Sequence, residues 1–222
     1  MVTFVQNLSR FWLGVTLACT VISSWTITCI IHLLPLKRVA KERISRVLTG
    51  SFLQMMFLCN PQIQFDIRGA ELFEEMAAQS EKKQKHSMVL QNHTSMADPL
   101  VYCGVASVPV IRITKTFMKV SLFKIPLFGT MNRNCGHFPV FFNSSQENNF
   151  SVDKEKQGAI TEKVDAHIAD FGVLALYPEG QINKNVRQLQ QFRRGALTTA
   201  FNHKMNVYAM ATRGCEDMWP YG

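Results

Sequence analysis

The feature that most constrains this chain is a run of 24 residues without a formal charge, FWLGVTLACTVISSWTITCIIHLL, from Phe11 to Leu34. A helix of that length rises about 36 Å, enough to cross a hydrocarbon core of roughly 30 Å. A buried core helix and a signal peptide are the alternatives. The basic cluster follows the run rather than preceding it, which argues against a cleaved signal. We therefore expect a transmembrane or membrane-embedded helix over about residues 11–34.

A basic cluster follows this run directly. Lys37, Arg38, Lys41, Arg43 and Arg46 stand there against the single acid Glu42. Lysine and arginine beside a membrane span stay on the cytosolic side and suit anionic headgroups. A second apolar run, 47–59, is too short to span and is expected to lie on the membrane or dock onto the domain. We therefore predict a membrane anchor over residues 1–59, comprising the span, a basic flank at 37–46 and a short apolar helix at 47–59, and a folded domain over residues 60–222.

Composition limits the partners of the chain. Of its 222 residues only 18% are charged, against about 25% in an ordinary soluble domain, and the net charge is +8. That charge suits nucleic acid, an anionic membrane surface or phosphate-bearing substrates. The basic residues cluster beside the apolar run and no base-stacking motif is present, so we expect no nucleic-acid partner. The six cysteines show no regular spacing, and we predict neither a disulfide framework nor a metal site.

Beyond residue 60, strand-like and helix-like segments alternate. Such alternation predicts the α/β class, and we expect a mixed sheet covered by helices. Strands are expected at 62–69, 87–91, 108–115, 137–142 and 173–180, and helices at 70–86 and 158–172. The polar stretch 143–151 is expected to be a surface loop.

Two polar clusters follow predicted strands. The strand SMVLQ runs into Asn92 and His93, and VLALYPEG runs into Glu179 and Gly180. Because ligands of α/β sheets bind beyond the carboxyl ends of the strands, both clusters are expected at one edge of the sheet. Asp98, in the first turn of a following helix, is placed to accept the Nδ1 proton of His93, leaving Nε2 as a general base. The alternative is that Asp98 caps that helix and His93 is an ordinary loop residue.

These clusters carry a resemblance to a known family. NHTSMAD resembles the N-H-x4-D signature of the glycerolipid acyltransferases that acylate lysophosphatidic acid and related acceptors, and LYPEGQ resembles their F-P-E-G-T/S block. IRGAELF, IPLFGTMNRNCGHFPVF and QFRRGA resemble further segments of the family, in the same order along the chain. The resemblance covers about Gln62 to Ala211 and implies a glycerol-3-phosphate acyltransferase-like fold, with residues 60–222 as the catalytic domain.

The resemblance also implies a reaction and roles for residues. His93 would take the proton from a lysophospholipid hydroxyl, which attacks the thioester carbonyl of acyl-coenzyme A, and Asp98 would orient the imidazole. The cosubstrate is acyl-coenzyme A, with no further cofactor. Glu179 would hold basic side chains or glycerol hydroxyls, and Gly180 would let the backbone approach the ligand. Lys115 would lie near the developing oxyanion, and Arg193 and Arg194 would bind phosphate.

The most direct reading is sn-2 acylation of lysophosphatidic acid to phosphatidic acid by an integral protein of the endoplasmic reticulum membrane, its catalytic domain facing the cytosol. The alternatives are another acceptor, such as lysophosphatidylcholine or a lysocardiolipin, and a non-catalytic member of the family. The acceptor is in question because the family's second block ends in an arginine where this chain has Phe142. Arg112, Arg133 and Arg194 are candidate replacements. Ser95 as a hydrolase nucleophile is disfavoured, since no G-x-S-x-G elbow surrounds it.

Overall fold

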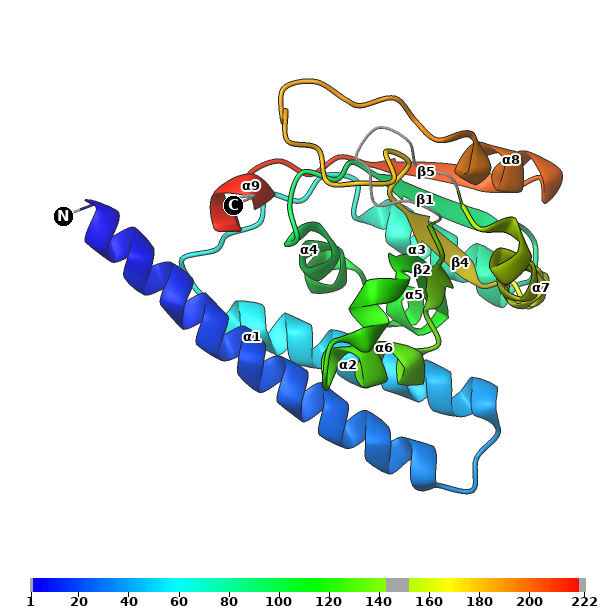
Figure 1. Ribbon diagram of the computed structural model, residues 1–222, viewed down its shortest axis with the longest axis horizontal. Coiled ribbons are helices and arrows are strands. Elements are labelled where there is room, and N and C mark those ends of the chain that lie inside the picture. The colour runs from blue at the N-terminus through cyan, green and yellow to red at the C-terminus, as the bar shows by residue number, and fades with distance from the viewer. Residues whose placement is uncertain (1, 143–151, 220–222) are drawn as a thin grey trace.

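The computed structural model describes residues 2–142 and 152–219 (Figure 1). Its α-helices are α1 (Val2–Leu33), α2 (Arg38–Leu58), α3 (Glu71–Glu81), α4 (Asp98–Val105), α5 (Val108–Ile113), α6 (Phe128–Cys135), α7 (Lys154–Ala169), α8 (Arg194–Asn202) and α9 (Cys215–Met218). A 3₁₀ helix, η1, spans Val120–Lys124. Its strands are β1 (Ser87–Gln91), β2 (Thr114–Lys119), β3 (Phe138–Val140), β4 (Val173–Leu176) and β5 (Asn206–Met210).

The strands form one sheet in the order β3-β2-β4-β1-β5. Every pairing between these strands is parallel. The predicted α/β class is confirmed, whereas the expected mixed pairing is not seen among the described strands. Helices connect successive strands, and such crossovers return the chain in the same direction. All five strands therefore end at one edge of the sheet, which we call the carboxyl edge.

Two predicted strands differ from the structure. Residues 62–69 run extended but pair with no strand, because an alternating pattern suits any half-buried extended segment. Residues 108–113 form α5, and β2 starts only at Thr114. Pro109 stands in the first turn of α5, where its fixed φ and missing N–H favour helix entry. The strand predicted at 87–91 is present as β1, and the other predicted strands and helices are present with shifted ends.

Helices cover both faces of the sheet. On one face, Val89 and Val173 pack against a cluster from α3, α4 and α5 that includes Met76 and Val110. On the other face, Met88, Leu174 and Phe138 pack against α7 and α8. Alternating strand residues thus enter opposite cores. A third cluster joins α1, α2, α4 and α9, so the N-terminal helices share a core with the α/β unit.

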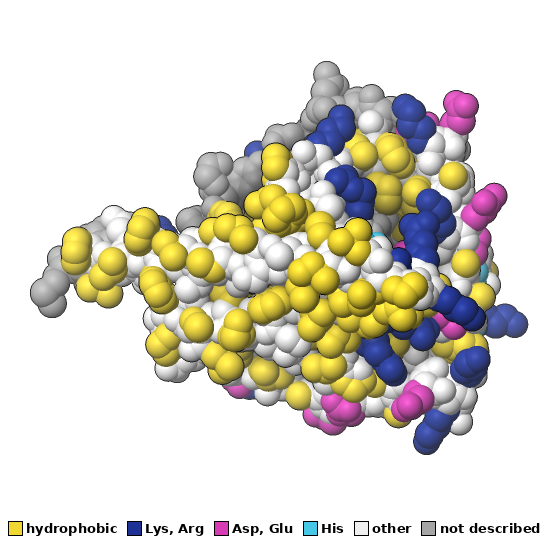
Figure 2. Space-filling model, turned by 90° about the horizontal axis from the view of Figure 1, so that it is seen from below, with side chains coloured by type: hydrophobic (Ala, Val, Ile, Leu, Met, Phe, Trp, Pro, Cys, Tyr) yellow, Lys and Arg dark blue, Asp and Glu magenta, His cyan; other side chains and the backbone are white. Residues whose placement is uncertain are grey.

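The α1 helix buries small polar residues and exposes large apolar ones, the reverse of a typical helix in a water-soluble protein. The α1 helix packs along α2 and α6, and Thr20, Ser24 and Thr28 form the buried side of that contact. Its apolar side chains face outward: Phe4, Val5, Leu8, Phe11, Trp12, Val15, Ile22, Ile30 and Leu33 are exposed. Small residues at the helix contact and large apolar residues outside are typical of helices packed in lipid. Figure 2 shows this apolar band along the underside of the molecule.

Among the described residues, one helix is long and apolar enough to cross a membrane, Phe4–Leu33, with a mean hydropathy of 1.7. This finding by itself is weak support for membrane association. The basic flank at 37–46 and the apolar run at 47–59 form a single helix, α2, and the flank is not uniformly exposed. Arg46 is buried and donates to the carbonyl oxygens of Arg112 and Cys135, which makes it a structural residue. The proposed domain boundary near residue 60 stays a prediction.

Two buried histidines, His137 and His167, are expected to make the fold less stable in acid. Burial, assisted by the nearby cations Arg46 and Lys115, lowers the pKa of His137 and of His167 to about 3. In the unfolded chain a histidine titrates at about 6.5, so only the unfolded state gains these protons as the pH falls from about 6.5 towards 3. We expect the free energy of unfolding, measured by denaturant titration, to fall through this range. In His167→Gln, which keeps a donor for the Val173 carbonyl, the fall should be shallower. An equal pH slope in wild type and variant would contradict this assignment.

Candidate active site

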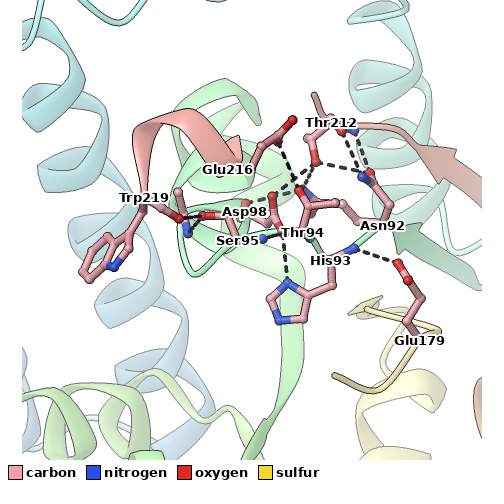
Figure 3. Close-up of polar contacts among 11 residues, drawn as sticks. Asn92, His93, Thr94, Ser95, Asp98, Glu179, Thr212, Glu216 and Trp219 are labelled. Atoms are coloured by element: carbon pink, nitrogen blue, oxygen red, sulfur yellow. Dashed lines mark hydrogen bonds and ion pairs between the residues drawn. The ribbon is translucent and has the colours of Figure 1, made fainter. Parts of the chain in front are cut away.

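A histidine–aspartate pair occupies the loop between β1 and α4, at the carboxyl edge. The strand ends at Gln91, and α4 begins at Asp98 with Pro99 in its first turn. The intervening turn brings His93 Nδ1 to 2.9 Å from Asp98 Oδ2 (Figure 3). The second ring nitrogen of His93, Nε2, points away from the carboxylate. The geometry therefore favours the tautomer in which Nδ1–H donates to Asp98 and Nε2 is free to accept a proton.

Asp98 is held as an anion by its neighbours. Its side chain is fully buried, and Oδ2 also accepts from the backbone N–H groups of Thr94 (2.7 Å) and Ser95 (2.9 Å). Burial alone raises the pKa of this carboxyl, but the hydrogen bonds from His93, Ser95, Cys215 and Thr94 outweigh it, and the pKa lies below its ordinary value. A charged, fixed carboxylate orients the imidazole and stabilises it when it becomes protonated.

Glu179 follows β4 at the same edge and braces the histidine loop. One carboxylate oxygen accepts the backbone N–H of His93 at 3.0 Å, and the other accepts that of Gln190 at 3.0 Å. The side chain is 1% exposed. Sequence reasoning expects Glu179 to hold ligand hydroxyls or basic side chains, whereas the structure uses both of its oxygens to bind two loops together.

The segment around Glu179 also forms a wall of the site. The Tyr177 ring stacks on the His93 ring with 4.1 Å between centroids. Gly180 has φ +73°, a left-handed conformation that favours glycine. A Cβ at this position would lie 3.2 Å from Arg193 Cγ, so the glycine permits close approach of this arginine. Gly180 thus serves the packing of the loop, and its part in ligand approach stays a prediction.

The structure brings some of the predicted basic residues to this edge. The N–H of Arg193 donates to the Pro178 carbonyl oxygen, and Arg194 starts α8 directly after it. Both arginines are exposed. Arg193, Arg194, Glu179 and Gly180 are therefore neighbours of the His93 loop.

Lys115 lies elsewhere. It pairs with Leu174 early in β4, and its ammonium group lies 2.6 Å from Glu42 of α2. This ion pair, below the carboxyl edge, does not bring Lys115 to the His93 loop. Four residues later, Lys119 ends β2 at the carboxyl edge and is exposed. Because Thr116 pairs with Ala175, Lys119 reaches the level of Pro178, two strands or about 10 Å from β1. Lys119 is therefore the β2 lysine that lies at the level of the carboxyl edge.

The three candidate replacements for the arginine that is absent at Phe142 also differ in their distance from the site. Arg112 closes α5 just before β2, at the opposite edge of the sheet. Arg133 donates to the Phe123 carbonyl oxygen and to Thr130. Phe142 forms an isolated antiparallel bridge with Val152. Of the three arginines, the described fold places only Arg194 beside the His93–Glu179 loops.

Several residues of the site are not predicted by the sequence motifs. Thr212, beyond β5, hydrogen-bonds with Asn92, and the loop residues Gln190 and Asn183 contact Glu179 and the His93 carbonyl. Thr212 lies 120 residues from Asn92 and Asn183 lies 90 residues from His93, so no local spacing reveals these two contacts. Gln190 lies 11 residues beyond Glu179, in the loop that follows it. Among the described residues, no group of three or more His, Cys, Asp or Glu is arranged to hold a metal ion.

Comparison with known proteins places the arrangement in a family. The acyltransferase family profile matches residues 65–213, two-thirds of the chain and the whole of the site. The chain belongs to the acyltransferase family. This confirms the family resemblance read from the sequence motifs. No curated protein sequence matches the chain.

Among solved structures, the chain resembles the 1-acyl-sn-glycerophosphate (LPA) acyltransferase PlsC from Thermotoga maritima. The TM-score is 0.61 at 16% sequence identity, and the alignment covers 93% of this chain and 73% of PlsC. At this identity the likeness establishes a shared fold. The acyltransferase fold thus carries the His93–Asp98 pair at the carboxyl edge of its sheet, where α/β enzymes bind ligands.

Proposed function

We propose that this acyltransferase moves an acyl chain from acyl-coenzyme A to the sn-2 hydroxyl of lysophosphatidic acid, forming phosphatidic acid. The observation that carries the proposal is the His93–Asp98 pair, whose geometry leaves one imidazole nitrogen available as a base. The acyltransferase family and the PlsC-like fold support acyl transfer to a glycerolipid. The donor, the sn-2 position and the acceptor headgroup are parts of the proposal.

The chain supplies a general base to this reaction. His93 Nε2 takes the proton of the acceptor hydroxyl as its oxygen attacks the thioester carbonyl. The carbon–sulfur bond then breaks, and the proton returns from His93 to the departing thiolate. Asp98 stabilises the intervening imidazolium, and no covalent acyl-enzyme is required because the acceptor brings its own nucleophile. General base catalysis of this kind contributes typically 10²–10⁴-fold.

The surroundings of Ser95 support transfer over a serine-nucleophile mechanism. Ser95 is buried, its hydroxyl donates to the Trp219 carbonyl oxygen at 2.7 Å, and it accepts from the Ala97 N–H. A hydroxyl held in this way is not directed at His93. The nucleophile in our proposal therefore comes from the acceptor lipid.

Basic residues at the carboxyl edge provide the proposed phosphate contacts. Arg193 and Arg194 lie at the start of α8 beside Pro178, and Lys119 ends β2 at the same edge, two strands from β1. Guanidinium groups bind phosphate oxygens in bidentate fashion, and an ammonium group acts as a point charge. In this proposal Arg194 takes the task for which the family uses an arginine at the position of Phe142.

The test measures thioester turnover by the purified 222-residue chain reconstituted into phospholipid vesicles. Free thiol should appear only when acyl-coenzyme A and a lysolipid are both present, and lysophosphatidic acid should be the preferred acceptor in a panel with lysophosphatidylcholine and a lysocardiolipin. Preference for another lysolipid replaces the acceptor but keeps the chemistry. Thiol release that needs no lysolipid overturns acyl transfer.

Membrane attachment through the outward face of α1 is part of the proposal. We expect Phe11→Asp combined with Ile22→Asp to lower binding to anionic phospholipid vesicles at least tenfold in a flotation assay. Each substitution removes an exposed apolar side chain that would otherwise contribute about 1.5–3 kcal/mol on burial in lipid. Phe201→Asp is the matched control, because Phe201 is equally apolar and 82% exposed but lies on α8. Equal flotation of the double variant and wild type would contradict this attachment.

We further propose residence in the endoplasmic reticulum with the catalytic domain in the cytosol. The basic residues that follow α1 support the cytosolic orientation. The triplets beginning at Asn143 and Asn149 are candidate glycosylation sites, but they lie outside the described residues. Both should stay unmodified in expressed protein. A glycosidase-induced mobility shift would place the domain in the lumen.

A further inference from the structure

A side-chain amide joins the end of β1 to the chain beyond β5. Asn92 Oδ1 accepts the backbone N–H of Thr212 at 2.7 Å, and Asn92 Nδ2 donates to the Thr212 carbonyl oxygen at 2.9 Å (Figure 3). Both hydrogen-bonding groups of the Thr212 backbone are thereby held by one side chain. We call this pair of bonds the Asn92 clamp. It continues the β1–β5 pairing, which ends at Gln91 and Met210, by another step.

The clamp sets the position of the Thr212 hydroxyl. Thr212 Oγ1 lies 3.4 Å from Asp98 Oδ1 and 3.2 Å from Asn92 Oδ1, and Gln91 Nε2 donates to it at 3.4 Å. Asn92 Oδ1 is already occupied by the Thr212 N–H. Since a charged acceptor forms the stronger hydrogen bond, the hydroxyl proton is best directed to Asp98.

The two oxygens of Asp98 are therefore held from different parts of the chain. Oδ2 is bound by His93 and by the backbone of its own loop, whereas Oδ1 meets a hydroxyl that comes from 114 residues further along the chain. The thiol of Cys215, at the start of α9, also hydrogen-bonds to this carboxylate. Without the Thr212 hydroxyl, the carboxylate would keep its bonds at Oδ2 and the Cys215 contact, but it would rotate more freely about its last bond, and this rotation would carry Oδ2 out of line with His93 Nδ1.

We propose that Asn92 and Thr212 are positioning residues for the His93–Asp98 pair. Asn92 fixes the chain after β5 against β1, and Thr212 uses that fixed position to lock the second oxygen of Asp98. The inference rests on the proposed acyl transfer for its kinetic consequence but not for its geometry. The inference explains why Asn92 directly precedes His93. Through Thr212, Asn92 holds the carboxylate of Asp98 that orients the histidine.

The position of β5 at the edge of the sheet explains why the chain that follows it needs the Asn92 clamp. Among the described strands β5 pairs only with β1, so the chain leaving it has support from one side. The segment then enters α9, where Trp219 and Glu216 contact Ser95 and Thr94 of the histidine loop. Loss of the clamp would therefore loosen both the hydroxyl and the cover of that loop. A misplacement of about 1 Å in catalytic geometry is enough to cost on the order of 10²-fold in rate.

The kinetic test compares Asn92→Ala, Thr212→Val and Thr212→Ser with wild type. We expect kcat to fall about 10- to 100-fold in the first two while KM for both substrates stays within about threefold, because positioning affects the transition state. Thr212→Ser keeps the hydroxyl and should recover most of the rate. Thr161→Val is the matched control, since the Thr161 hydroxyl bonds only its own helix at Gln157. The double variant should be little worse than either single one, as expected of residues that act through one contact.

A second readout does not depend on turnover. The His93 Nδ1–H proton, held by Asp98, should give a downfield NMR resonance in wild type, Thr212→Ser and Thr161→Val. It should shift or broaden in Asn92→Ala and Thr212→Val, with His93→Ala identifying the signal. An unchanged resonance in both variants overturns the proposal, even if the protein transfers no acyl group. Full turnover in both variants, beside an inactive His93→Ala, overturns it while leaving the proposed function intact.

Discussion

Replacing His93 with alanine is expected to lower kcat for acyl transfer by about 10²–10⁴-fold and leave the fold unchanged. The loss is that of the general base, because Nε2 of this imidazole is the nitrogen left free by the bond from Nδ1 to Asp98. KM for the two substrates should change little, since His93 acts on the transferred proton. Initial rates of thiol release at saturating substrates measure the effect.

The chain contains a matched control for this substitution. His203 Nε2 lies 3.1 Å from Asp165, the same residue pair at a similar distance, but both residues are partly exposed and lie on the α7–α8 side of the molecule. His203→Ala should keep the wild-type rate. If His93→Ala also keeps the wild-type rate, the assigned mechanism is wrong, whatever the acceptor turns out to be.

Glu179→Ala is expected to damage stability and activity together. The substitution leaves the backbone N–H groups of His93 and Gln190 buried without their acceptor, at about 1–3 kcal/mol for each. We therefore expect the free energy of unfolding to fall by roughly 2–6 kcal/mol, together with a loss of kcat as the histidine loop moves. Denaturant titration and thiol-release rates measure the two effects on the same preparations.

Two further variants separate bracing from ligand binding. Glu179→Gln keeps one acceptor oxygen, and we expect a smaller loss of stability than in Glu179→Ala. Glu162→Ala, an exposed glutamate on α7, should change neither property. A Glu179→Ala protein with wild-type stability and a raised KM for the lysolipid would instead support the ligand-binding task that the sequence resemblance implies.

The contrast between Glu179 and His93 shows what a motif conveys. His93 and Asp98 are close in sequence, and a turn entering a helix leaves them few relative positions, so their contact follows from spacing and local structure. The contacts of Glu179 depend on which strands are adjacent. Because β4 and β1 are neighbours in the sheet, the residues that follow them meet, and one Glu179 oxygen accepts the backbone N–H of His93. The other oxygen accepts that of Gln190, from the loop that follows Glu179 itself.

Lys115 illustrates the opposite case. The sequence places it in a predicted strand near the first motif, but the helix α5 delays the start of β2 until Thr114. The lysine consequently lies early in the strand and pairs with Glu42, and Lys119 takes the place at the carboxyl edge. A strand rises about 3.3 Å per residue, so four residues displace a side chain by about 13 Å, more than a catalytic contact allows.

The amino-acid sequence by itself predicted the α/β class, the acyltransferase motifs and a candidate pairing of His93 with Asp98, because each depends on local periodicity or on short spacing. It also marked the apolar run at 11–34. Only the tertiary structure decided that Thr20, Ser24 and Thr28 face the protein while the apolar side chains of α1 face outward. Only the tertiary structure brought Glu179 and Thr212 to the catalytic pair, since the order of strands in a parallel sheet sets which distant residues meet at its carboxyl edge.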